Sequence, residues 1–359
     1  MTTSTPTIMI MAGGTGGHVF PGLAVAQFLR EQGWRVVWMG VPGAMESRLV
    51  PPHGFEMAWV RAVAARGQGL LAALLLPTRL LLAFWQSARV LLRVQPDVVL
   101  GMGGYVAFPG GMMASLLNRP LAVHEQNSVA GLTNRLLAHV ADCVMVAFPN
   151  AIQRALCTGN PVRAAITTLA APDVRYAARN GPLNILVLGG SLGAQALNTI
   201  VPQGLALLAP TQRPVVVHQS GERHLAQLQA NYAHAGVQAT CVAFIDEMAT
   251  AYAHADLVIC RAGALTVSEL AAAGVPALFV PFPHAVDDHQ TANAKYLVDA
   301  GAAQCIAQSE LTPTRLAAYL SGLNRTQLLQ MAQRARGLGQ PNATRDVAQA
   351  CMQLMKERA

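Results

Sequence analysis

The chain has 359 residues, which exceeds one typical hydrophobic core and favours two domains. Hydrophobic residues make up 53% of it and charged residues only 12%, which argues against extensive disorder. The formal net charge of +7 suits an anionic partner, but aromatic residues are scarce and no basic, aromatic-interleaved run occurs, so we expect no nucleic acid partner.

The beginning of the chain and its cysteines bear on the cellular compartment. The apolar run Ile8–Ala12 ends at Gly13 and is too short for the apolar region of a secretory signal peptide. None of the six cysteines forms a CxxC pair, and several lie in apolar segments, which indicates core thiols in a reducing compartment. We therefore expect a cytoplasmic protein.

The first elements are a strand at Thr7–Ala12, a helix at Val19–Glu31 and a strand at Val36–Met39. Between the first strand and the helix lies Gly13-Gly14-Thr15-Gly16-Gly17-His18, so the unit is Rossmann-like. The dinucleotide fingerprint fails, because Val19 replaces its third glycine and no acidic residue ends the second strand. The loop also lacks the Walker GK[ST] signature. It either approaches an anion closely, with the His18 imidazole at its end, or only lets the helix pack on the strand.

The stretch Met57–Gln95 contains five arginines and no acidic residue, interleaved with leucines. At about 100° per residue, Arg79, Gln86, Arg89 and Arg93 fall within about a quarter of a helix circumference, and the remainder is apolar. Pro77 and the arginines argue against a membrane-spanning helix. Two interpretations remain: a core helix with one solvated stripe, or a segment whose Gly69–Pro77 portion touches an anionic membrane surface.

Polar residues follow the later strands of the first half. Strands are expected at Asp97–Leu100, Leu121–Val123 and Cys143–Ala147, and helices from Pro109 and at Thr133–His139. His124-Glu125-Gln126-Asn127-Ser128 follows the second of these strands, where open α/β sheets place their ligands. His124 and Glu125 are therefore candidate catalytic residues, although a polar strand end without a chemical role is the alternative. Gly159–Arg163 has the composition of a turn between two domains.

The second half repeats the opening arrangement. After a loop at Pro172–Gly181, the apolar run Leu183–Leu188 leads into Gly189-Gly190-Ser191-Leu192-Gly193, the same GG[TS]xG pattern before a helix. The repeat indicates two similar α/β domains in tandem. Further strands are expected at Val215–His218, Cys241–Phe244, Leu257–Cys260 and Ala277–Pro281, and helices at Ala264–Ala273, Thr326–Ala335 and Asn342–Lys356.

The unit Leu257–Ala273 carries the more specific signal. Its strand, the break at Arg261–Gly263 and its helix direct backbone N–H groups at whatever lies beyond the strand. A helix amino terminus carries roughly half a positive charge and suits a phosphate. Glu269, about a turn and a half into the helix, is placed to accept hydrogen bonds from a ribose; the alternative is a solvated surface residue beside a surface Ser268.

Other chemistries lack their motifs. The histidines show no HExxH-type spacing, and no DxD-type acid pair precedes a diphosphate loop, so we predict no protein-bound metal and no cofactor. A hydrolase triad is unsupported, because no GxSxG sequence occurs.

Taken together and in order, seven motifs point to one family: Ala12–His18, Gly101-Met102-Gly103-Gly104-Tyr105, His124–Asn127, Gly159–Arg163, Gly189–Ala194, Arg261–Glu269 and Asp288–Gln290. Over nearly its whole length the chain resembles the peptidoglycan glycosyltransferases that add N-acetylglucosamine to lipid I. The resemblance implies an α/β fold of glycosyltransferase-B type, with two Rossmann-like domains facing a cleft. Residues 1–163 would form the acceptor and membrane-docking domain and residues 164–340 the domain for UDP-N-acetylglucosamine. A helix in residues 341–359 would pack back on the first domain.

The resemblance also assigns residues to the donor and the acceptor. Ser191 and the backbone of Ala264, Leu265 and Thr266 would meet the diphosphate, with Val267 and Ser268 beside them. Glu269 would bind the ribose, the Ile245 backbone the uracil and Gln290 the sugar hydroxyls. Further donor positions are Thr15, Gly16, Gly17, Asn127 and Arg163, and the acceptor positions are Tyr105 and Asn134. Leu192 departs from the glutamine of some relatives, which leaves the glycine frame intact.

The implied reaction is an inverting transfer to the 4-hydroxyl of N-acetylmuramic acid, in which helix and loop amides stabilise the departing UDP without a metal. A general base must take the hydroxyl proton, and our hypothesis is His18, with Glu125 or His124 as its competitor. The enzyme would lie at the cytoplasmic face of the inner membrane, on whose anionic surface Leu70–Leu76 would dock beside Arg61, Arg66 and Arg79. Other cell-wall synthesis proteins are partners that the resemblance leaves open.

Two rival functions share parts of this pattern. A UDP-N-acetylglucosamine 2-epimerase has the same two-domain plan but needs no lipid and no apolar basic face. A non-catalytic scaffold that binds a nucleotide sugar at the membrane would not need His18, Glu269 and Gln290 together.

Overall fold

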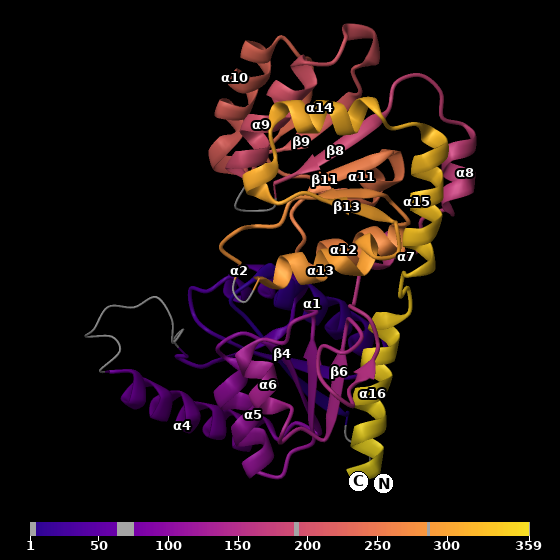
Figure 1. Cartoon of the computed structure of the whole chain (residues 1–359). Helices are drawn as coiled ribbons and strands as arrows, with labels where there is room; N and C mark the ends of the chain where they lie inside the picture. Colours follow the sequence, from indigo (N-terminus) through magenta and orange to yellow (C-terminus); the bar gives the residue numbers. More distant parts are fainter. Residues whose placement is uncertain (1–4, 63–74, 190–193, 286–287, 359) are drawn as a thin grey trace. The chain divides into compact units, whose positions relative to one another are not determined.

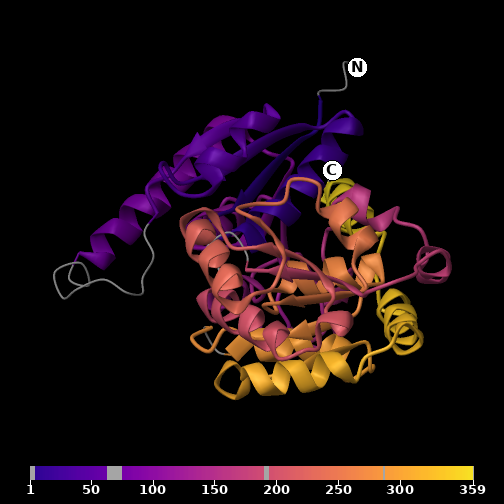
Figure 2. The ribbon, with the colours of Figure 1, turned by 90° about the horizontal axis from the view of Figure 1, so that it is seen from above.

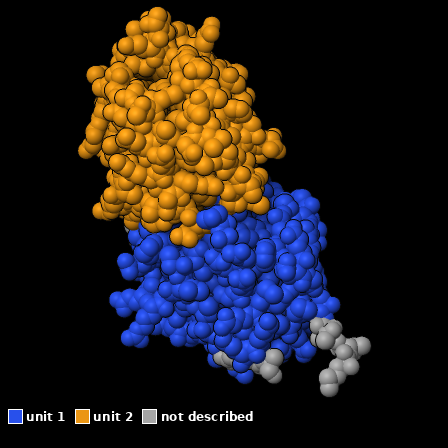
Figure 3. Space-filling model, turned by 90° about the vertical axis from the view of Figure 1, so that its right-hand side faces the viewer, with its two compact units in different colours: residues 1–163, 341–359 blue, residues 164–340 orange. Residues whose placement is uncertain are grey.

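The computed structural model describes residues 5–62, 75–189, 194–285 and 288–358 (Figure 1). The chain divides into two compact units, residues 1–163 with 341–359 and residues 164–340 (Figure 3). Each unit holds one sheet in which every strand pair is parallel. The prediction of two α/β domains built on parallel sheets is therefore confirmed.

The first unit has a seven-stranded sheet in the order β3-β2-β1-β4-β5-β6-β7. Its strands are β1 (Thr7–Ala12), β2 (Arg35–Gly40), β3 (Glu56–Trp59), β4 (Val98–Gly103), β5 (Leu121–Glu125), β6 (Cys143–Val146) and β7 (Leu156–Cys157). Its helices are α1 (Gly16–Glu31), α2 (Glu46–Leu49), the 3-10 turn η1 (Pro51–His53), α4 (Leu76–Val94), α5 (Ala107–Leu116), α6 (Leu132–Leu137) and α16 (Ala343–Arg358). The strand order reverses between β1 and β4, which is where open α/β sheets bind ligands.

Two apolar layers enclose this sheet. On one side α1 and the carboxyl-terminal α16 pack together, and Val347, Ala348, Cys351 and Leu354 of α16 share a core with Ile8 and Ile10 of β1. On the other side α4 and α5 cover a core that contains Met9 and Met11 (Figure 1). Alternate β1 residues thus face opposite layers, and all six residues of the strand are buried, as expected for a central parallel strand.

The second unit has a six-stranded sheet in the order β10-β9-β8-β11-β12-β13. Figure 2 shows helices of this unit, coloured from pink to yellow, around its strands. Its strands are β8 (Asn184–Leu188), β9 (Val215–Gln219), β10 (Thr240–Val242), β11 (Leu257–Cys260), β12 (Ala277–Phe279) and β13 (Ala303–Cys305). Its helices are α7 (Ala164–Thr167), α8 (Pro172–Ala177), α9 (Gln195–Ala206), α10 (Leu225–Ala235), α11 (Met248–His254), α12 (Ala264–Ala273), α13 (His289–Val298), α14 (Pro313–Ser321) and α15 (Arg325–Gly337), with 3-10 turns η2 (Pro210–Gln212), η3 (Glu222–His224) and η5 (Gln308–Glu310). The order again reverses between the first strand and the fourth, here β8 and β11.

Several expected boundaries are wrong. Pro172–Gly181, expected as a loop, begins with α8, which has Pro172 in its first turn and Asp173 beside the positive end of the helix dipole. The guanidinium of Arg175 fixes this helix by donating to the carbonyl oxygens of Tyr252, Ala273 and Gly274. The strand expected at Cys241–Phe244 is β10, which starts one residue earlier and ends at Val242.

The cysteines differ from the expectation that they are core thiols. All six are free, but Cys157 is exposed and Cys143, Cys241 and Cys305 are only partly buried. Cys260 and Cys351 lie in the core, and burial raises the pKa of both thiols.

Candidate active site

The first glycine loop joins β1 to α1 at the point where the strand order reverses. The sequence analysis missed Glu46, a buried carboxylate that holds this loop in place. Its Oε2 accepts from the Gly14 amide at 3.1 Å and its Oε1 from the Val41 amide at 3.0 Å. Thr15 is the amino-terminal cap of α1, but its side chain makes no capping hydrogen bond. The loop can therefore offer an anion the amides at the start of α1 rather than that of Gly14.

The glycines after β1 and at the end of β4 make room for two candidate side chains. Gly103 has a φ of +107°, and a Cβ there would lie 2.9 Å from Cε1 of His18. A Cβ on Gly14 would lie 3.1 Å from the Tyr105 ring. Burial, and then the charge of Glu46, raise the pKa of Tyr105, which keeps its phenol protonated and able to donate a hydrogen bond.

His18 stands in the first turn of α1 and is partly exposed. Its Nδ1 lies 2.7 Å from Oε1 of Gln126, and in the part of the chain that the structure describes its Nε2 has no hydrogen-bond partner. This imidazole therefore has one nitrogen held by the protein and one available to a substrate.

His124 differs from His18 both in its exposure and in the availability of its ring nitrogens. It is fully buried at the end of β5, with Nε2 2.9 Å from the carbonyl oxygen of Gly159 and Nδ1 3.0 Å from Nε2 of Gln126. Burial lowers its pKa to about 4, outweighing the hydrogen bond to Gly159 and the charge of Glu125, which both raise the pKa, so the ring stays neutral near neutral pH. With both nitrogens occupied and no exposed surface, His124 is poorly placed to take a proton from a substrate.

Glu125 organises the loop that follows β5. The side chain is 1% exposed, and its two carboxylate oxygens accept from the amide and Nδ2 of Asn127, the amide of Gly131 and Nδ2 of Asn134, at 2.8, 3.2, 3.1 and 2.9 Å. Four hydrogen bonds hold the carboxylate in place and occupy both of its oxygens, so it is poorly placed to take a proton from a substrate.

The two asparagines are held by that carboxylate. Asn134, in α6, is 2% exposed, and its Nδ2 also donates to the His124 carbonyl oxygen at 3.2 Å. Its Oδ1 is buried and accepts no hydrogen bond from the described residues, so it is an acceptor group at the site that is ready for a donor. Arg163 is exposed and is the last residue of the first unit before α7.

In the second unit, the groups expected to bind the diphosphate follow β8 and β11, the two strands between which the strand order reverses. Ser191 lies outside the described residues, as does the rest of 190–193. The amino terminus of α12 has Gly263 as its cap, with no side-chain hydrogen bond, and the first helical bond runs from the Val267 amide to the Gly263 carbonyl oxygen. The amides of Ala264, Leu265 and Thr266 precede that bond and point out of the helix end. Val267 is fully buried and has its amide occupied, whereas Ser268 is partly exposed.

Glu269 is not the solvated surface residue of the alternative interpretation. It is 4% exposed, and its Oε2 accepts from the hydroxyl of buried Tyr252 in α11 at 3.1 Å. Sequence reasoning missed Tyr252 as the partner of this carboxylate. Ile245 is half-buried just beyond β10, and Gln290 lies in the first turn of α13, where its Oε1 accepts from the Phe282 amide at 2.9 Å.

The family follows from comparison with known proteins. The model of the glycosyltransferase family 28 N-terminal domain matches residues 8–146, and that of the family 28 C-terminal domain matches residues 184–350. A relative from Dechloromonas aromatica is 59% identical over 98% of this chain and 99% of its own length. The chain belongs to glycosyltransferase family 28.

Relatives within the family carry one name. The Dechloromonas aromatica protein and a Cupriavidus metallidurans protein, 62% identical over 97% of this chain and 98% of its own length, are each called UDP-N-acetylglucosamine--N-acetylmuramyl-(pentapeptide) pyrophosphoryl-undecaprenol N-acetylglucosamine transferase. A crystal structure of MurG from Acinetobacter baumannii is 43% identical with a TM-score of 0.86, covering 97% of this chain and 99% of that one. The predicted glycosyltransferase-B type of fold is confirmed for this family 28 chain.

A more distant structure shows the fold alone. The UDP-GlcNAc 2-epimerase from Neisseria meningitidis is 13% identical with a TM-score of 0.66, over 97% of this chain and 100% of that one. Among the described residues of the family 28 chain, no group of three or more His, Cys, Asp or Glu side chains is placed to hold a metal ion.

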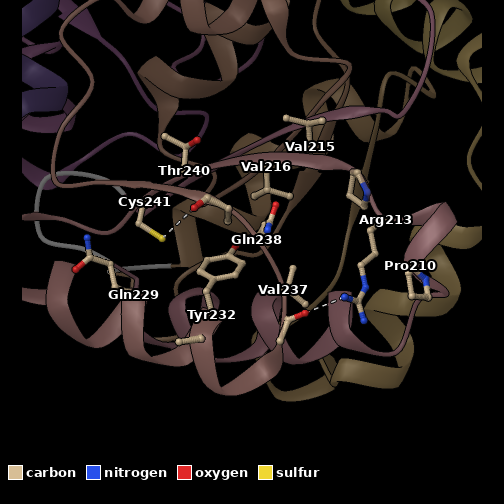
Figure 4. A pocket seen from close by; sticks show the side chains of 14 residues that line it. Pro210, Arg213, Val215, Val216, Gln229, Tyr232, Val237, Gln238, Thr240 and Cys241 are labelled. Atoms are coloured by element: carbon tan, nitrogen blue, oxygen red, sulfur yellow. Dashed lines mark hydrogen bonds between the residues drawn. The ribbon is translucent and has the colours of Figure 1, made fainter.

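A hollow of about 990 Å³ in the second unit is a poor candidate for the donor site. It lies at the amino ends of β9 and β10 beside the end of α10, with Val215, Tyr232 and Thr240 in its lining (Figure 4). Ligands of parallel sheets bind at the opposite, carboxyl ends. Its arginine, Arg213, is also occupied by the carbonyl oxygens of Ala206, Leu208 and Gly236.

Helix α4 of the family 28 chain is not a core helix with a single solvated stripe. Ala83, Ser87, Val90 and Leu91 face the core, whereas Leu81 is 69% and Trp85 58% exposed, and Leu92 is exposed as well. At about 100° per residue these three exposed side chains span about 40°, next to the sector of Arg79, Arg89 and Arg93. Residues 63–74, with Arg66 and most of Leu70–Leu76, lie outside the described residues. None of the described helices is both long and apolar enough to cross a lipid bilayer.

Proposed function

We propose that this chain is an inverting glycosyltransferase that moves N-acetylglucosamine from UDP-N-acetylglucosamine to the 4-hydroxyl of the N-acetylmuramic acid of lipid I, undecaprenyl-pyrophosphoryl-MurNAc-pentapeptide. The product is lipid II, the precursor of peptidoglycan. The observation that carries the proposal is the 59% and 62% identity, over nearly the full length of both chains, with relatives that bear this transferase's name.

The second unit would hold the donor. The three uncapped amides of Ala264, Leu265 and Thr266, at the positive end of α12, suit the diphosphate and would stabilise the charge that develops on UDP as the glycosidic bond breaks. Glu269, one and a half turns along the same helix, would accept hydrogen bonds from the ribose. Ile245 and Gln290 retain their proposed contacts with uracil and the sugar hydroxyls, and Ser191 retains its proposed contact with the diphosphate.

The first unit would present the acceptor. Nε2 of His18 takes the proton as the 4-hydroxyl oxygen attacks the anomeric carbon, and the bond to UDP breaks with inversion. Tyr105 lies beside Gly14 and Asn134 beside Gly103, and they would offer a donor and an acceptor to lipid I, respectively. We prefer His18 over His124 and Glu125 as the base, because the latter two have their polar atoms occupied by the protein.

Replacing the base gives the first prediction. A general base contributes about 10²–10⁴-fold, so His18→Ala is expected to lower kcat/KM by at least about 10²-fold. The exposed His139, altered to alanine, is the matched control and should leave kcat/KM unchanged. A loss of less than about tenfold in the His18 variant would remove this residue from the role of base.

Transfer of radiolabel from UDP-N-acetylglucosamine to a short-chain lipid I analogue tests the function as a whole. We expect a labelled lipid product and stoichiometric UDP that forms only when the acceptor is present. Release of UDP without acceptor, together with N-acetylmannosamine, would indicate an epimerase. Binding of the nucleotide sugar with no turnover under any condition would indicate a scaffold.

We also propose that the enzyme binds peripherally at the cytoplasmic face of the inner membrane. The exposed side chains Leu81, Trp85 and Leu92 and the adjoining arginines of α4 combine apolar area with positive charge, which suits the interface of an anionic bilayer. Such a surface would bring the first unit to a substrate whose polyprenyl chain is embedded in lipid.

A further inference from the structure

A chain of hydrogen bonds leads inward from His18 through the first unit. His18 Nδ1 lies 2.7 Å from Gln126 Oε1, Gln126 Nε2 lies 3.0 Å from His124 Nδ1, and His124 Nε2 lies 2.9 Å from the Gly159 carbonyl oxygen. Gln126 and His124 are 1% and 0% exposed, so bulk water does not compete for these contacts. Three of the four groups can either donate or accept, and the direction of the chain decides what His18 can do.

The inner end of the chain sets its direction. A carbonyl oxygen only accepts, so the hydrogen of neutral His124 must lie on Nε2, which donates to Gly159. Nδ1 of His124 is then an acceptor, and the NH2 group of Gln126 must face it. The amide cannot be flipped, because Gln126 Nε2 also lies 2.9 Å from the His124 carbonyl oxygen, and a flip would place two oxygens against each other.

The outer end follows from this orientation. With its NH2 group turned inward, Gln126 presents Oε1 to His18, and the 2.7 Å contact requires a hydrogen on Nδ1 of His18. In a neutral imidazole the other nitrogen then carries the lone pair. The ring also lies against Gly103, where a Cβ would approach Nδ1 to 3.0 Å.

We propose that Gln126 is a positioning residue that holds His18 in the Nδ1–H tautomer, so that Nε2 is the proton acceptor, and that His124 and the Gly159 carbonyl fix the Gln126 amide in the orientation this requires. The proposal rests on the proposed function only in taking His18 as the base of the transfer. The buried polar residues at the end of β5 thereby set the tautomer of a side chain that stands 108 positions away from Gln126 in the sequence.

The tautomer itself is measured first, on the full-length protein without substrates. Side-chain ¹⁵N spectra of histidine-labelled protein at about pH 8, where an ordinary imidazole is neutral, are assigned with His18→Gln. We expect a protonated, pyrrole-type Nδ1 and a pyridine-type Nε2 for His18. A hydrogen on Nε2 of His18 would overturn the proposal, whether or not the enzyme transfers sugar.

Steady-state kinetics then test whether Gln126 is the residue that holds His18 in the catalytic tautomer. Gln126→Met keeps the length of the side chain but removes the acceptor, and Gln353→Met, at an exposed position of α16, is the matched control. Loss of a group that fixes a catalytic tautomer can lower kcat by about 10⁴-fold, so we expect kcat to fall at least about tenfold. The KM for UDP-N-acetylglucosamine should stay within about twofold, because the donor groups are untouched.

The outcomes separate this inference from the proposed function. An Nδ1–H tautomer with a Gln126→Met variant of unchanged kcat would overturn the role of Gln126 while leaving the transferase intact. An Nδ1–H tautomer that shifts toward Nε2–H in Gln126→Met would support the inference even if lipid I were not the acceptor. If Gln126→Met does not fold, the wild-type spectrum alone decides.

Discussion

At the scale of single residues, Glu269 shows how burial decides between two interpretations of one position. An acidic residue inside a helix is usually solvated, yet this one is 4% exposed and bonded to the Tyr252 hydroxyl. Tyr252 is itself buried in α11, so the carboxylate is held in a fixed orientation rather than free to move. A fixed carboxylate loses little entropy when it binds a pair of ribose hydroxyls.

We therefore predict that Glu269→Ala mainly raises the KM for UDP-N-acetylglucosamine. A hydrogen bond to a charged group contributes about 1.5–3 kcal/mol, which corresponds to about 10–100-fold in KM. Tyr252→Phe, which removes only the orienting hydroxyl, should give a smaller increase. Glu310→Ala, at an exposed glutamate of the same unit, is the control in steady-state kinetics with varied donor. An unchanged KM in correctly folded Glu269→Ala would exclude the ribose contact.

The residues that sequence reasoning found and those it missed differ in how far away their partners lie. The loop of His18 and the helix of Glu269 could be predicted because strand, glycine break and helix are consecutive in the chain. The roles of Glu46 and Gln126 could not, because they depend on contacts with Gly14 and His18, which are 32 and 108 positions away. Side-chain types alone also left His124 and Glu125 as competitors of His18 for the role of base, and burial and hydrogen bonding separate the three.

At the scale of elements, central strands were predicted well and edge elements poorly. β1, β11 and α12 have the predicted bounds, because each strand is an apolar run closed by a glycine-containing loop and α12 ends at Gly274 with a φ of +63°. β10 and β7 lie at sheet edges: both residues of β7, which was not predicted, are exposed, and β10 ends at Val242 although the apolar run on which it was predicted continues to Phe244. α8 was missed because its six residues are too few for helical periodicity to show.

At this scale we predict that the exposed apolar side chains of helix α4 contribute to membrane binding. Leu81→Glu together with Trp85→Glu should lower binding to vesicles that contain phosphatidylglycerol by at least about tenfold, because each large apolar side chain contributes about 1.5–3 kcal/mol when buried. Salt should weaken the remaining binding, since the arginines of α4 act through screened charge. Co-sedimentation measures both effects.

A matched pair of exposed leucines outside α4 provides the control. Leu116→Glu with Leu156→Glu alters equally exposed side chains on α5 and β7 and should leave vesicle binding unchanged. Both double variants should turn over a soluble short-chain acceptor at the wild-type rate. Equal sedimentation of wild type and the α4 variant would remove this helix from the membrane surface.

At the scale of the whole molecule, the two units share a sheet topology and a buried histidine. Each has its first and fourth strands side by side at the centre of a parallel sheet, and in the sequence of each a glycine-rich motif follows the first strand. Each also buries a histidine near the carboxyl end of a strand that has a neighbour on both sides. In the second unit this is His218 of β9, whose ring nitrogens lie 2.9 Å from the Tyr232 hydroxyl and 3.1 Å from Asn198 Oδ1. Both units thus retain a neutral imidazole that supports the polar strand ends from within.

These two histidines make the stability of both units depend on pH. Burial lowers the pKa of His124 to about 4 and that of His218 to about 3, whereas both have an ordinary pKa of about 6.5 in the unfolded chain. The unfolded state therefore binds more protons below about pH 6.5. This contribution to the free energy of unfolding is fully present above that pH and falls as the pH drops, by about 2 kcal/mol for each histidine at pH 5.

Urea unfolding at two pH values tests this dependence. The urea concentration at the unfolding midpoint should be lower at about pH 5 than at about pH 7. The difference should shrink in His218→Gln and persist in the exposed control His139→Gln. Equal midpoints at the two pH values would show that these imidazoles are not buried in neutral form.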